Sequence, residues 1–220
     1  EAEVLSSSTA NTIYLLGDSH AGHYAAAVSH VAKQNNHNLI YPQQKELGLK
    51  NNAEPQEYIL APIDKYSKQF KQGDIIIFSA AAHKYLEPHH WTHHYETFLE
   101  QTKNLGLKYI LISPTANFSS QPVWENCQQE WYRPSWAIAQ RCFTRTSKKE
   151  WMSMKRQALI ALEAFIRKNP NVAYIDAFTR LCPNDYCLNH DQGILLYRDH
   201  HHLSSHGAMK IADILNNQLD

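Results

Sequence analysis

The chain has 220 residues, 43% of them hydrophobic, which is enough for one domain with a buried core. Lys+Arg and Asp+Glu balance at 21 each, which argues against a nucleic-acid partner or an anionic membrane surface. No apolar run approaches the roughly 20 residues that a membrane helix needs. Because the sequence begins at Glu1 without a Met or a signal peptide, we expect a mature or excised form. Residues 1–11 are then a polar arm or cloning scar, and residues 12–220 a single domain.

A serine follows the first predicted strand. Thr12 to Leu16 has the β-branched and aromatic content of a buried strand, and the Ala-rich segment from Gly22 to Lys33 predicts the helix behind it. Ser19 lies at the turn between them, at the carboxyl end of a strand, where open α/β sheets bind ligands. Ser19 is therefore a candidate nucleophile, although capping the helix would explain it equally well.

The rest of the chain alternates between strand and helix patterns. Further strands are predicted at Asn38–Tyr41, Asp74–Phe78, Tyr109–Ile112 and Val172–Asp176. Helices are predicted at Pro55–Lys71, Pro88–Leu105, Lys148–Lys168 and Leu203–Leu219, with Gly73 and Gly106 as helix stops. A loop-rich insertion occupies residues 114–147. This order predicts a three-layer α/β/α sandwich around a five-stranded parallel sheet, similar to flavodoxin.

A serine nucleophile needs a base, and the base needs an orienting group. Asp199-His200-His201-His202 precedes the last predicted helix and supplies both. The spacing lets Asp199 fold back toward Nδ1 of His202 while Nε2 faces outward. His200 and His201 lack an Asp at that offset, so His202 is the candidate base.

These two motifs carry a resemblance to a known family. Gly17-Asp18-Ser19-His20 together with Asp199-x-x-His202-Leu203-Ser204-x-x-Gly207-Ala208 resembles the SGNH (GDSL-like) hydrolases. It is closest to the SGNH domains attached to bacterial membrane O-acyltransferases. The resemblance implies an SGNH fold with Ser19 as nucleophile, His202 as base and Asp199 as its partner.

The resemblance is less complete for the oxyanion hole, where the backbone N–H of Ser19 is one expected donor. SGNH enzymes place a glycine in the loop after the second strand, and Gly48 takes that place here, although Gly48 could simply form a turn. Typical members also carry Gly-x-Asn-Asp after the third strand, whereas this chain has Ser79-Ala80-Ala81-Ala82-His83. Either His83 replaces the missing donor, or backbone groups alone form the hole.

The four cysteines occur in two local pairs within irregular segments. Pairing Cys127 with Cys142 and Cys182 with Cys187 closes two short loops, and neither pair has Cys-x-x-Cys spacing. We therefore predict two disulfides and an oxidising compartment, with free thiols in the cytosol as the alternative.

Histidines are the most obvious candidate metal ligands. His89, His90, His93 and His94 could share a helix face, but no acidic or thiolate ligand accompanies them. A solvated start of a helix explains them better, so neither a metal nor a cofactor is expected.

Together these features predict a serine-dependent acyl-transfer enzyme. The resemblance implies an O-acyltransferase that transfers O-acetyl groups to a bacterial cell-surface polysaccharide or glycan. It also implies a periplasmic or extracellular location, with the acyl group supplied by a membrane acyltransferase domain outside this chain, which could tether it to the inner membrane. Trp124, Trp131, Tyr132 and Trp136 of the insertion could form a wall for the sugar. Two alternatives stay open: a carbohydrate esterase with the same triad, and a glycan-binding module whose catalytic site has decayed.

Overall fold

The computed structural model describes residues 10–42, 45–49, 55–86, 90–119, 127 and 142–219. Its centre is a five-stranded parallel sheet in the order β2-β1-β3-β4-β6. The strands are β1 (Thr12–Gly17), β2 (Asn38–Ile40), β3 (Ile75–Ser79), β4 (Lys108–Ile112) and β6 (Val172–Ile175). The predicted five-stranded parallel sheet is confirmed.

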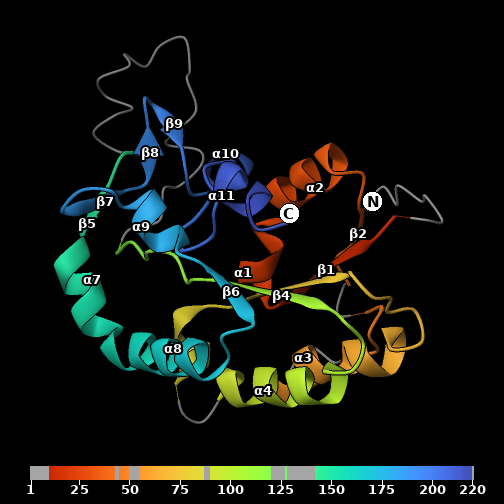
Figure 1. Cartoon of the computed structure of the whole chain (residues 1–220). Helices are drawn as coiled ribbons and strands as arrows, with labels where there is room; N and C mark the ends of the chain where they lie inside the picture. The colour runs from red at the N-terminus through yellow and green to blue at the C-terminus, as the bar shows by residue number, and fades with distance from the viewer. Residues whose placement is uncertain are drawn as a thin grey trace.

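Helices cover both faces of this sheet (Figure 1). One face carries α2 (Ala25–Gln34), α10 (Ser205–Met209) and α11 (Ala212–Asn216), and the other carries α3 (Pro55–Tyr66), α4 (Trp91–Thr102) and α8 (Arg156–Lys168). The predicted three-layer sandwich is therefore confirmed. No helix in the described ranges is both long enough and apolar enough to cross a membrane.

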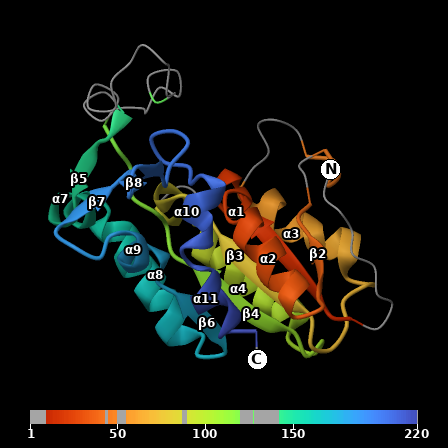
Figure 2. The same ribbon diagram turned by 90° about the horizontal axis from the view of Figure 1, so that it is seen from above.

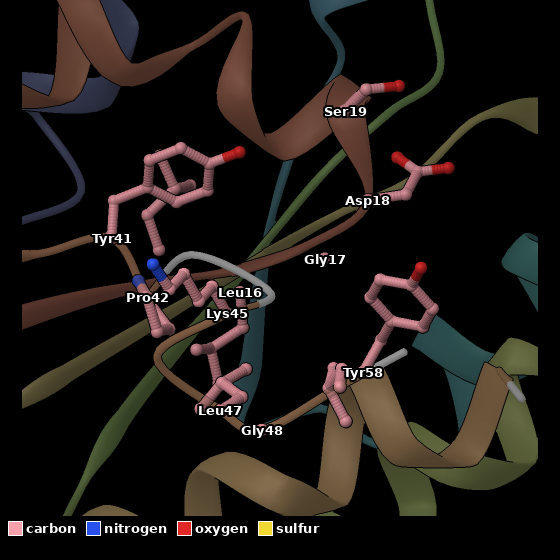
Figure 3. Close-up of a pocket in the computed structure, with 12 residues that line it drawn as sticks. Leu16, Gly17, Asp18, Ser19, Tyr41, Pro42, Lys45, Leu47, Gly48 and Tyr58 are labelled. Atoms are coloured by element: carbon pink, nitrogen blue, oxygen red, sulfur yellow. The ribbon is translucent and has the colours of Figure 1, made fainter. Parts of the chain in front are cut away.

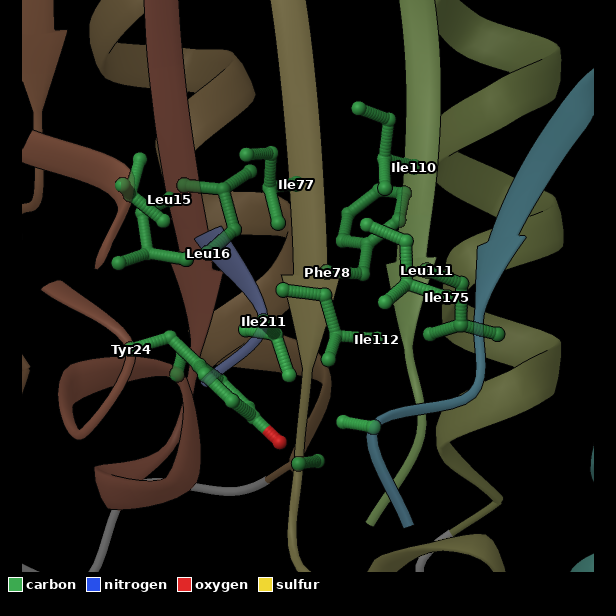
Figure 4. Packing of buried hydrophobic residues seen from close by; sticks show 14 of the residues in the cluster. Leu15, Leu16, Tyr24, Ile77, Phe78, Ile110, Leu111, Ile112, Ile175 and Ile211 are labelled. Carbon is green, nitrogen blue, oxygen red and sulfur yellow. The ribbon is translucent and has the colours of Figure 1, made fainter. Parts of the chain in front are cut away.

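The core lies between the sheet and the two helical layers (Figure 4). Ile75, Ile76, Ile77 and Phe78 of β3 are each at most 1% exposed. A central parallel strand is covered on both faces, so it selects an unbroken apolar run rather than an alternating one. The burial of each large side chain here stabilises the fold by about 2 kcal/mol.

Smaller elements gather beside the main sheet in Figure 2. They are β5 (Arg145–Ser147), α7 (Lys148–Met154), α9 (Ala177–Leu181), β7 (Tyr186–Leu188), β8 (His190–Asp191) and β9 (Ile194–Leu195). β5 pairs with β7 and β8 pairs with β9, both antiparallel. α7 falls within the helix predicted from Lys148, but the sequence pattern indicated only loops for the other five elements, because strands of two or three residues carry too little periodicity to detect.

The helix predicted from Gly22 to Lys33 is wrong at its start. The Asp18 carboxylate accepts the backbone N–H of His20 at 2.8 Å, so a separate helical turn, α1 (Ser19–Gly22), begins directly after it. α2 starts only at Ala25. α1 ends at Gly22, where the missing side chain leaves room for Tyr41, whose hydroxyl would lie 2.3 Å from a Cβ there.

Gly73 and Gly106 do not stop helices. α3 ends at Tyr66, whose carbonyl accepts the N–H of both Gln69 and Phe70 in a closing turn, and α4 ends at Thr102. Both glycines have positive φ, and the Gly73 N–H donates to the Gly106 carbonyl at 2.9 Å. They therefore tie together the turns that lead into β3 and β4.

Two long predicted helices are each divided. The segment from Lys148 to Lys168 breaks at Lys155, whose backbone leaves helical geometry with φ −100° and ψ 8°. The last segment becomes α10 and α11, and Ser204 caps α10 by accepting the Gly207 N–H at 3.0 Å. These breaks come from backbone geometry and capping, which side-chain periodicity does not report.

Candidate active site

The Ser19 turn is held by close backbone packing at the end of β1. Gly17 has φ +144°, and a Cβ at this position would lie 1.8 Å from the Ser79 carbonyl oxygen of the neighbouring strand. Only glycine allows β1 and β3 to approach this closely before the chain turns. Asp18 then caps α1 and also accepts the Ala81 N–H at 3.2 Å. Ser19, the first residue of α1, is exposed at the carboxyl edge of the sheet.

Backbone hydrogen bonds join the two ends of the loop that carries His202. The Arg198 N–H donates to the His202 carbonyl at 2.9 Å, and Tyr197 forms a β-bridge with Leu203. Within this loop, Oδ1 of Asp199 accepts the backbone N–H groups of His201 at 2.9 Å and His202 at 2.7 Å. The carboxylate is thus fixed by the same short loop that positions the imidazole.

Ser19, His202 and Asp199 lie in one hydrogen-bonded row. Nδ1 of His202 is 2.7 Å from Oδ2 of Asp199, and Nε2 is 2.7 Å from Oγ of Ser19. Burial alone would raise the pKa of Asp199, but hydrogen bonds from His201 and His202 outweigh it and lower that pKa to about 2. An ionised Asp199 accepts only, so Nδ1 of His202 donates to it. Nε2 then accepts the Ser19 hydroxyl proton.

Two further histidines pack against His202. His20 is 3% exposed, and its Nε2 lies 2.9 Å from Nδ1 of His201, whose ring centroid is 3.9 Å from that of His202. Burial, followed by repulsion from neighbouring imidazoles, lowers the pKa of His20 to about 3 and that of His201 to about 4. At neutral pH both are uncharged, so they wall the site without adding a positive charge beside His202.

The hydrogen bond between His20 and His201 has a preferred direction. Nδ1 of His20 is buried and has no partner within the described ranges. Burying an N–H group without an acceptor costs more free energy than burying a ring nitrogen that carries only a lone pair. The proton of His20 therefore sits on Nε2 and is donated to Nδ1 of His201. His23 lies behind this pair, where its Nδ1 accepts the Leu203 N–H at 3.4 Å.

The residues able to share a metal ion lie here rather than on α4. His20, His201 and His202 form one such group and Asp199, His200 and His201 another, with ligand atoms within 4.8 Å of one another. In both groups side chains are already engaged with one another: His20 with His201, His202 with Ser19, and Asp199 with His202. Of the four histidines considered from the sequence, His89 lies outside the described residues, and His90, His93 and His94 belong to neither group.

Two cavities open on either side of Ser19. The first, of about 740 Å³, is lined by Ser19, Asp18, Gly17, Leu15, Leu16, Tyr41, Pro42, Lys45, Leu47, Gly48, Leu49 and Tyr58 (Figure 3). The second, of about 510 Å³, shares Asp18, Ser19 and Tyr58 with the first. It is completed by His20, Ala81, Ala82, His83, Lys84, Trp91, Asn117, Lys155, His200 and His201. Both volumes suit a small-molecule or sugar ligand.

The candidate oxyanion residues occupy different places around Ser19. Gly48 lines the larger cavity with φ +70°, but its N–H donates to the Lys45 carbonyl at 3.2 Å and so already closes a turn. His83 lies in η1 (Ala82–Tyr85), is exposed, and lines the smaller cavity. The hydrogen bond from the Ala81 N–H to Asp18 links this segment to the turn that carries Ser19.

Several lining residues were not identified from the sequence. Tyr41, Tyr58, Lys84 and Lys155 come from segments far apart along the chain and meet only in the folded protein. His20, by contrast, stands directly beside Ser19 in the first motif, so that motif could have indicated it. The insertion aromatics Trp124, Trp131, Tyr132 and Trp136 lie outside the described residues.

Both predicted disulfides are confirmed. Cys127 and Cys142 are joined with a Cα–Cα distance of 5.1 Å, and Cys182 and Cys187 with one of 4.4 Å. Both distances fall in the usual range for disulfides. The bonds close the two local loops that the sequence spacing indicated.

Comparison with solved structures supports the fold. A GDSL-like lipase from Bacteroides thetaiotaomicron superposes with a TM-score of 0.55 at 10% identity, covering 97% of this chain and 90% of the lipase. A Bacteroides fragilis protein described as an acylhydrolase superposes with a TM-score of 0.53 at 12% sequence identity, and the match covers 100% of this chain and 93% of the acylhydrolase. YxiM of Bacillus subtilis superposes with a TM-score of 0.54 at 18% sequence identity, and the match covers 96% of this chain and 56% of YxiM.

No curated protein matches this chain in sequence, but a family model does. The model for the SGNH domain that is fused to AT3 domains matches residues 1–217. Since that match spans nearly the whole chain, the protein belongs to the family of SGNH domains fused to AT3 domains.

Proposed function

We propose that this SGNH domain is a serine-dependent O-acyltransferase that acetylates a hydroxyl of a bacterial cell-surface glycan through an acyl-Ser19 intermediate. The observation that carries the proposal is the row of two 2.7 Å contacts from Asp199 through His202 to Ser19, open to a cavity on each side. A serine in this arrangement is activated by its neighbouring base.

The proposed reaction has two steps, acylation of Ser19 and transfer of the acyl group to the glycan. Ser19 Oγ attacks the carbonyl carbon of an acyl donor while Nε2 of His202 takes the hydroxyl proton, which then passes to the leaving group as the donor bond breaks. A glycan hydroxyl next attacks the acyl-Ser19 carbonyl and gives its proton to His202. The bond to Oγ breaks, and that proton returns to Ser19. Ionised Asp199 stabilises the imidazolium in both steps.

Charge also develops on the carbonyl oxygen during each attack. The backbone N–H of Ser19, in the first turn of α1, is our first proposed donor, and His83 is the second because it lines the same cavity as Ser19. Gly48 is a weaker candidate since its N–H closes a turn with Lys45. Loss of one such donor costs about 10²- to 10³-fold in rate in serine proteases.

The setting of this domain fits transfer outside the cytoplasm. Two disulfides and a family fused to AT3 domains point to an extracellular or periplasmic domain. We propose that a membrane AT3 domain of the same protein delivers the acyl group and tethers this domain to the inner membrane. The glycan acceptor would approach from the opposite, aqueous side.

A carbohydrate esterase is the second candidate. It is favoured by the exposure of Ser19, which lets water reach the acyl-enzyme. The third, a glycan-binding module without catalysis, is supported only by the absence of the Gly-x-Asn-Asp motif, because Ser19, His202 and Asp199 are all present and in contact.

The test begins with p-nitrophenyl acetate and the isolated domain. We expect a burst of one p-nitrophenolate per chain, an acetyl group on Ser19 by mass spectrometry, and slow release. Ser19→Ala abolishes the burst. Ser205→Ala, at another exposed serine that opens a short helix, is the matched control and keeps it.

Adding glycan acceptors then separates the three candidates. A transferase releases acetyl-Ser19 faster in the presence of its acceptor and places the acetyl group on the sugar. Rapid hydrolysis of acetylated glycans without transfer identifies an esterase. An equal burst in wild type and Ser19→Ala rejects all acyl chemistry at this serine.

A further inference from the structure

The charge around Ser19 differs from that of the protein as a whole. The chain has 21 basic and 21 acidic residues. Among the described residues that line the two cavities, Lys45, Lys84 and Lys155 are basic and Asp18 alone is acidic. Asp18 accepts two backbone N–H groups, which offset part of its negative charge. The site is therefore locally cationic on a neutral protein.

The two cavities differ in the number of basic side chains that line them. The larger one has Lys45 beside four leucines, Leu15, Leu16, Leu47 and Leu49, with Tyr41, Tyr58 and Pro42. The smaller one holds Lys84 and Lys155 beside Asn117, His83, His200 and His201. With two basic side chains and one acidic side chain in its lining, the smaller cavity is the better place for an anionic acceptor.

Lys84 and Lys155 reach the smaller cavity from separate parts of the fold. Lys84 lies in η1, with its ammonium 5.8 Å from the centre of the Trp91 ring, a contact that restricts where the charge can lie. Lys155 lies at the junction between α7 and α8. Both are partly buried rather than fully solvated.

Neither lysine forms an ion pair with a carboxylate in the ranges that the structure describes, although Asp18 lines the same cavity and the positive charge of Lys84 acts on it. There, Lys103, Lys168 and Lys210 are paired with Glu100, Glu96 and Asp191, respectively, whereas no ion pair involves Lys84 or Lys155. A negatively charged ligand in this cavity would meet two ammonium groups and one carboxylate, so the balance of charge favours its binding.

We propose that the acceptor is an acidic saccharide whose carboxylate or phosphate group is bound between Lys84 and Lys155. This proposal rests on the proposed acyl transfer and names its substrate class. The anion anchors the sugar in the smaller cavity while a neighbouring hydroxyl meets the acyl group on Ser19. Transfer itself needs no further reactant, because the hydroxyl proton passes through His202 to the released Ser19.

Binding to the Ser19→Ala variant tests the anion site without any chemistry. The probes are trigalacturonic acid and its methyl ester, which keep the same ring hydroxyls and differ in charge, together with glucose 6-phosphate and glucose. We expect the acid to bind at least about tenfold more tightly than the ester, as one charge-assisted hydrogen bond predicts. Comparing the two acids shows whether the site prefers carboxylate or phosphate.

Lysine substitutions locate the site. In the Ser19→Ala background, Lys84→Gln and Lys155→Gln each reduce the preference for acid over ester several-fold, and the double substitution removes it. Lys103→Gln, which neutralises an exposed lysine paired with Glu100, leaves the preference unchanged. Circular dichroism of each variant shows that the fold is intact.

The possible failures are distinguishable. Equal binding of acid and ester, no binding of either, or a preference that survives the double substitution each overturns the acidic acceptor. A preference that depends on both lysines, in a protein that forms no acyl-Ser19 from p-nitrophenyl acetate, supports the anion site and rejects the acyltransferase instead.

Discussion

Replacing Asp199 with asparagine tests whether its charge controls the tautomer of His202. Oδ1 of Asp199 accepts the backbone N–H groups of His201 and His202, and Oδ2 faces Nδ1 of His202 at 2.7 Å. If the amide oxygen keeps the two backbone bonds, the NH₂ group must face Nδ1. Nδ1 then becomes the acceptor, and the proton moves to Nε2, where it points at Ser19 and blocks deprotonation.

The alternative is that the amide flips. The flipped amide would restore an acceptor for Nδ1 but would place its NH₂ against two backbone N–H groups. Leaving two partly buried donors unsatisfied costs about 1–3 kcal/mol each, so the productive form is populated to a few per cent at most. We therefore expect acylation of Ser19 to slow by at least about 30-fold, and by up to about 10⁴-fold as in serine proteases.

The assay is the single-turnover rate of p-nitrophenolate release, with ¹⁵N chemical shifts of the His202 ring as a direct report of its tautomer. Asp176→Asn is the matched control, because Asp176 is exposed and also accepts a backbone N–H, that of Thr179 at 2.9 Å. It should leave the rate unchanged. A rate for Asp199→Asn within tenfold of wild type, or an unchanged His202 tautomer, would refute tautomer control by the charge.

Three further predictions concern stability, each measured by urea unfolding. Because burial lowers the pKa of His20 to about 3, the native protein binds fewer protons than the unfolded chain below about pH 6.5, and stability falls as pH falls toward 3. His20→Asn should reduce the dependence of the free energy of unfolding on pH by about 1.4 kcal/mol per pH unit in this range. An unchanged pH dependence would contradict the lowered pKa of His20. Gly17→Ala should lower the free energy of unfolding by at least about 1–3 kcal/mol, because the new Cβ would collide with the Ser79 carbonyl oxygen and because alanine rarely adopts the positive φ of this residue. A variant as stable as wild type would disprove that packing. Replacing both Cys182 and Cys187 with serine should cost about 2 kcal/mol, as expected for a loop with a sequence separation of 5, and no loss would exclude that bond as a stabilising link.

Several features of this protein could be predicted from its sequence because they depend on near neighbours. The apolar runs of β1, β3 and β4 predict buried parallel strands, and each disulfide closes a loop within one segment. The offset between Asp199 and His202 likewise lies within one loop. Helix ends were predicted less well, since caps such as Asp18 and Ser204 and the backbone at Lys155 set them.

Only the tertiary structure decided what surrounds the serine. Ser19 and His202 are 183 positions apart, and the sheet brings them within 2.7 Å. Burial makes His20 and His201 neutral neighbours of His202, which their residue type alone does not reveal. The same long-range packing places Lys84 and Lys155 in one cavity, although nothing in their local sequence links them. The local pattern therefore predicted the groups that we propose to carry the chemistry, whereas packing between distant segments determined the protonation of the neighbouring histidines and which side chains line the cavities.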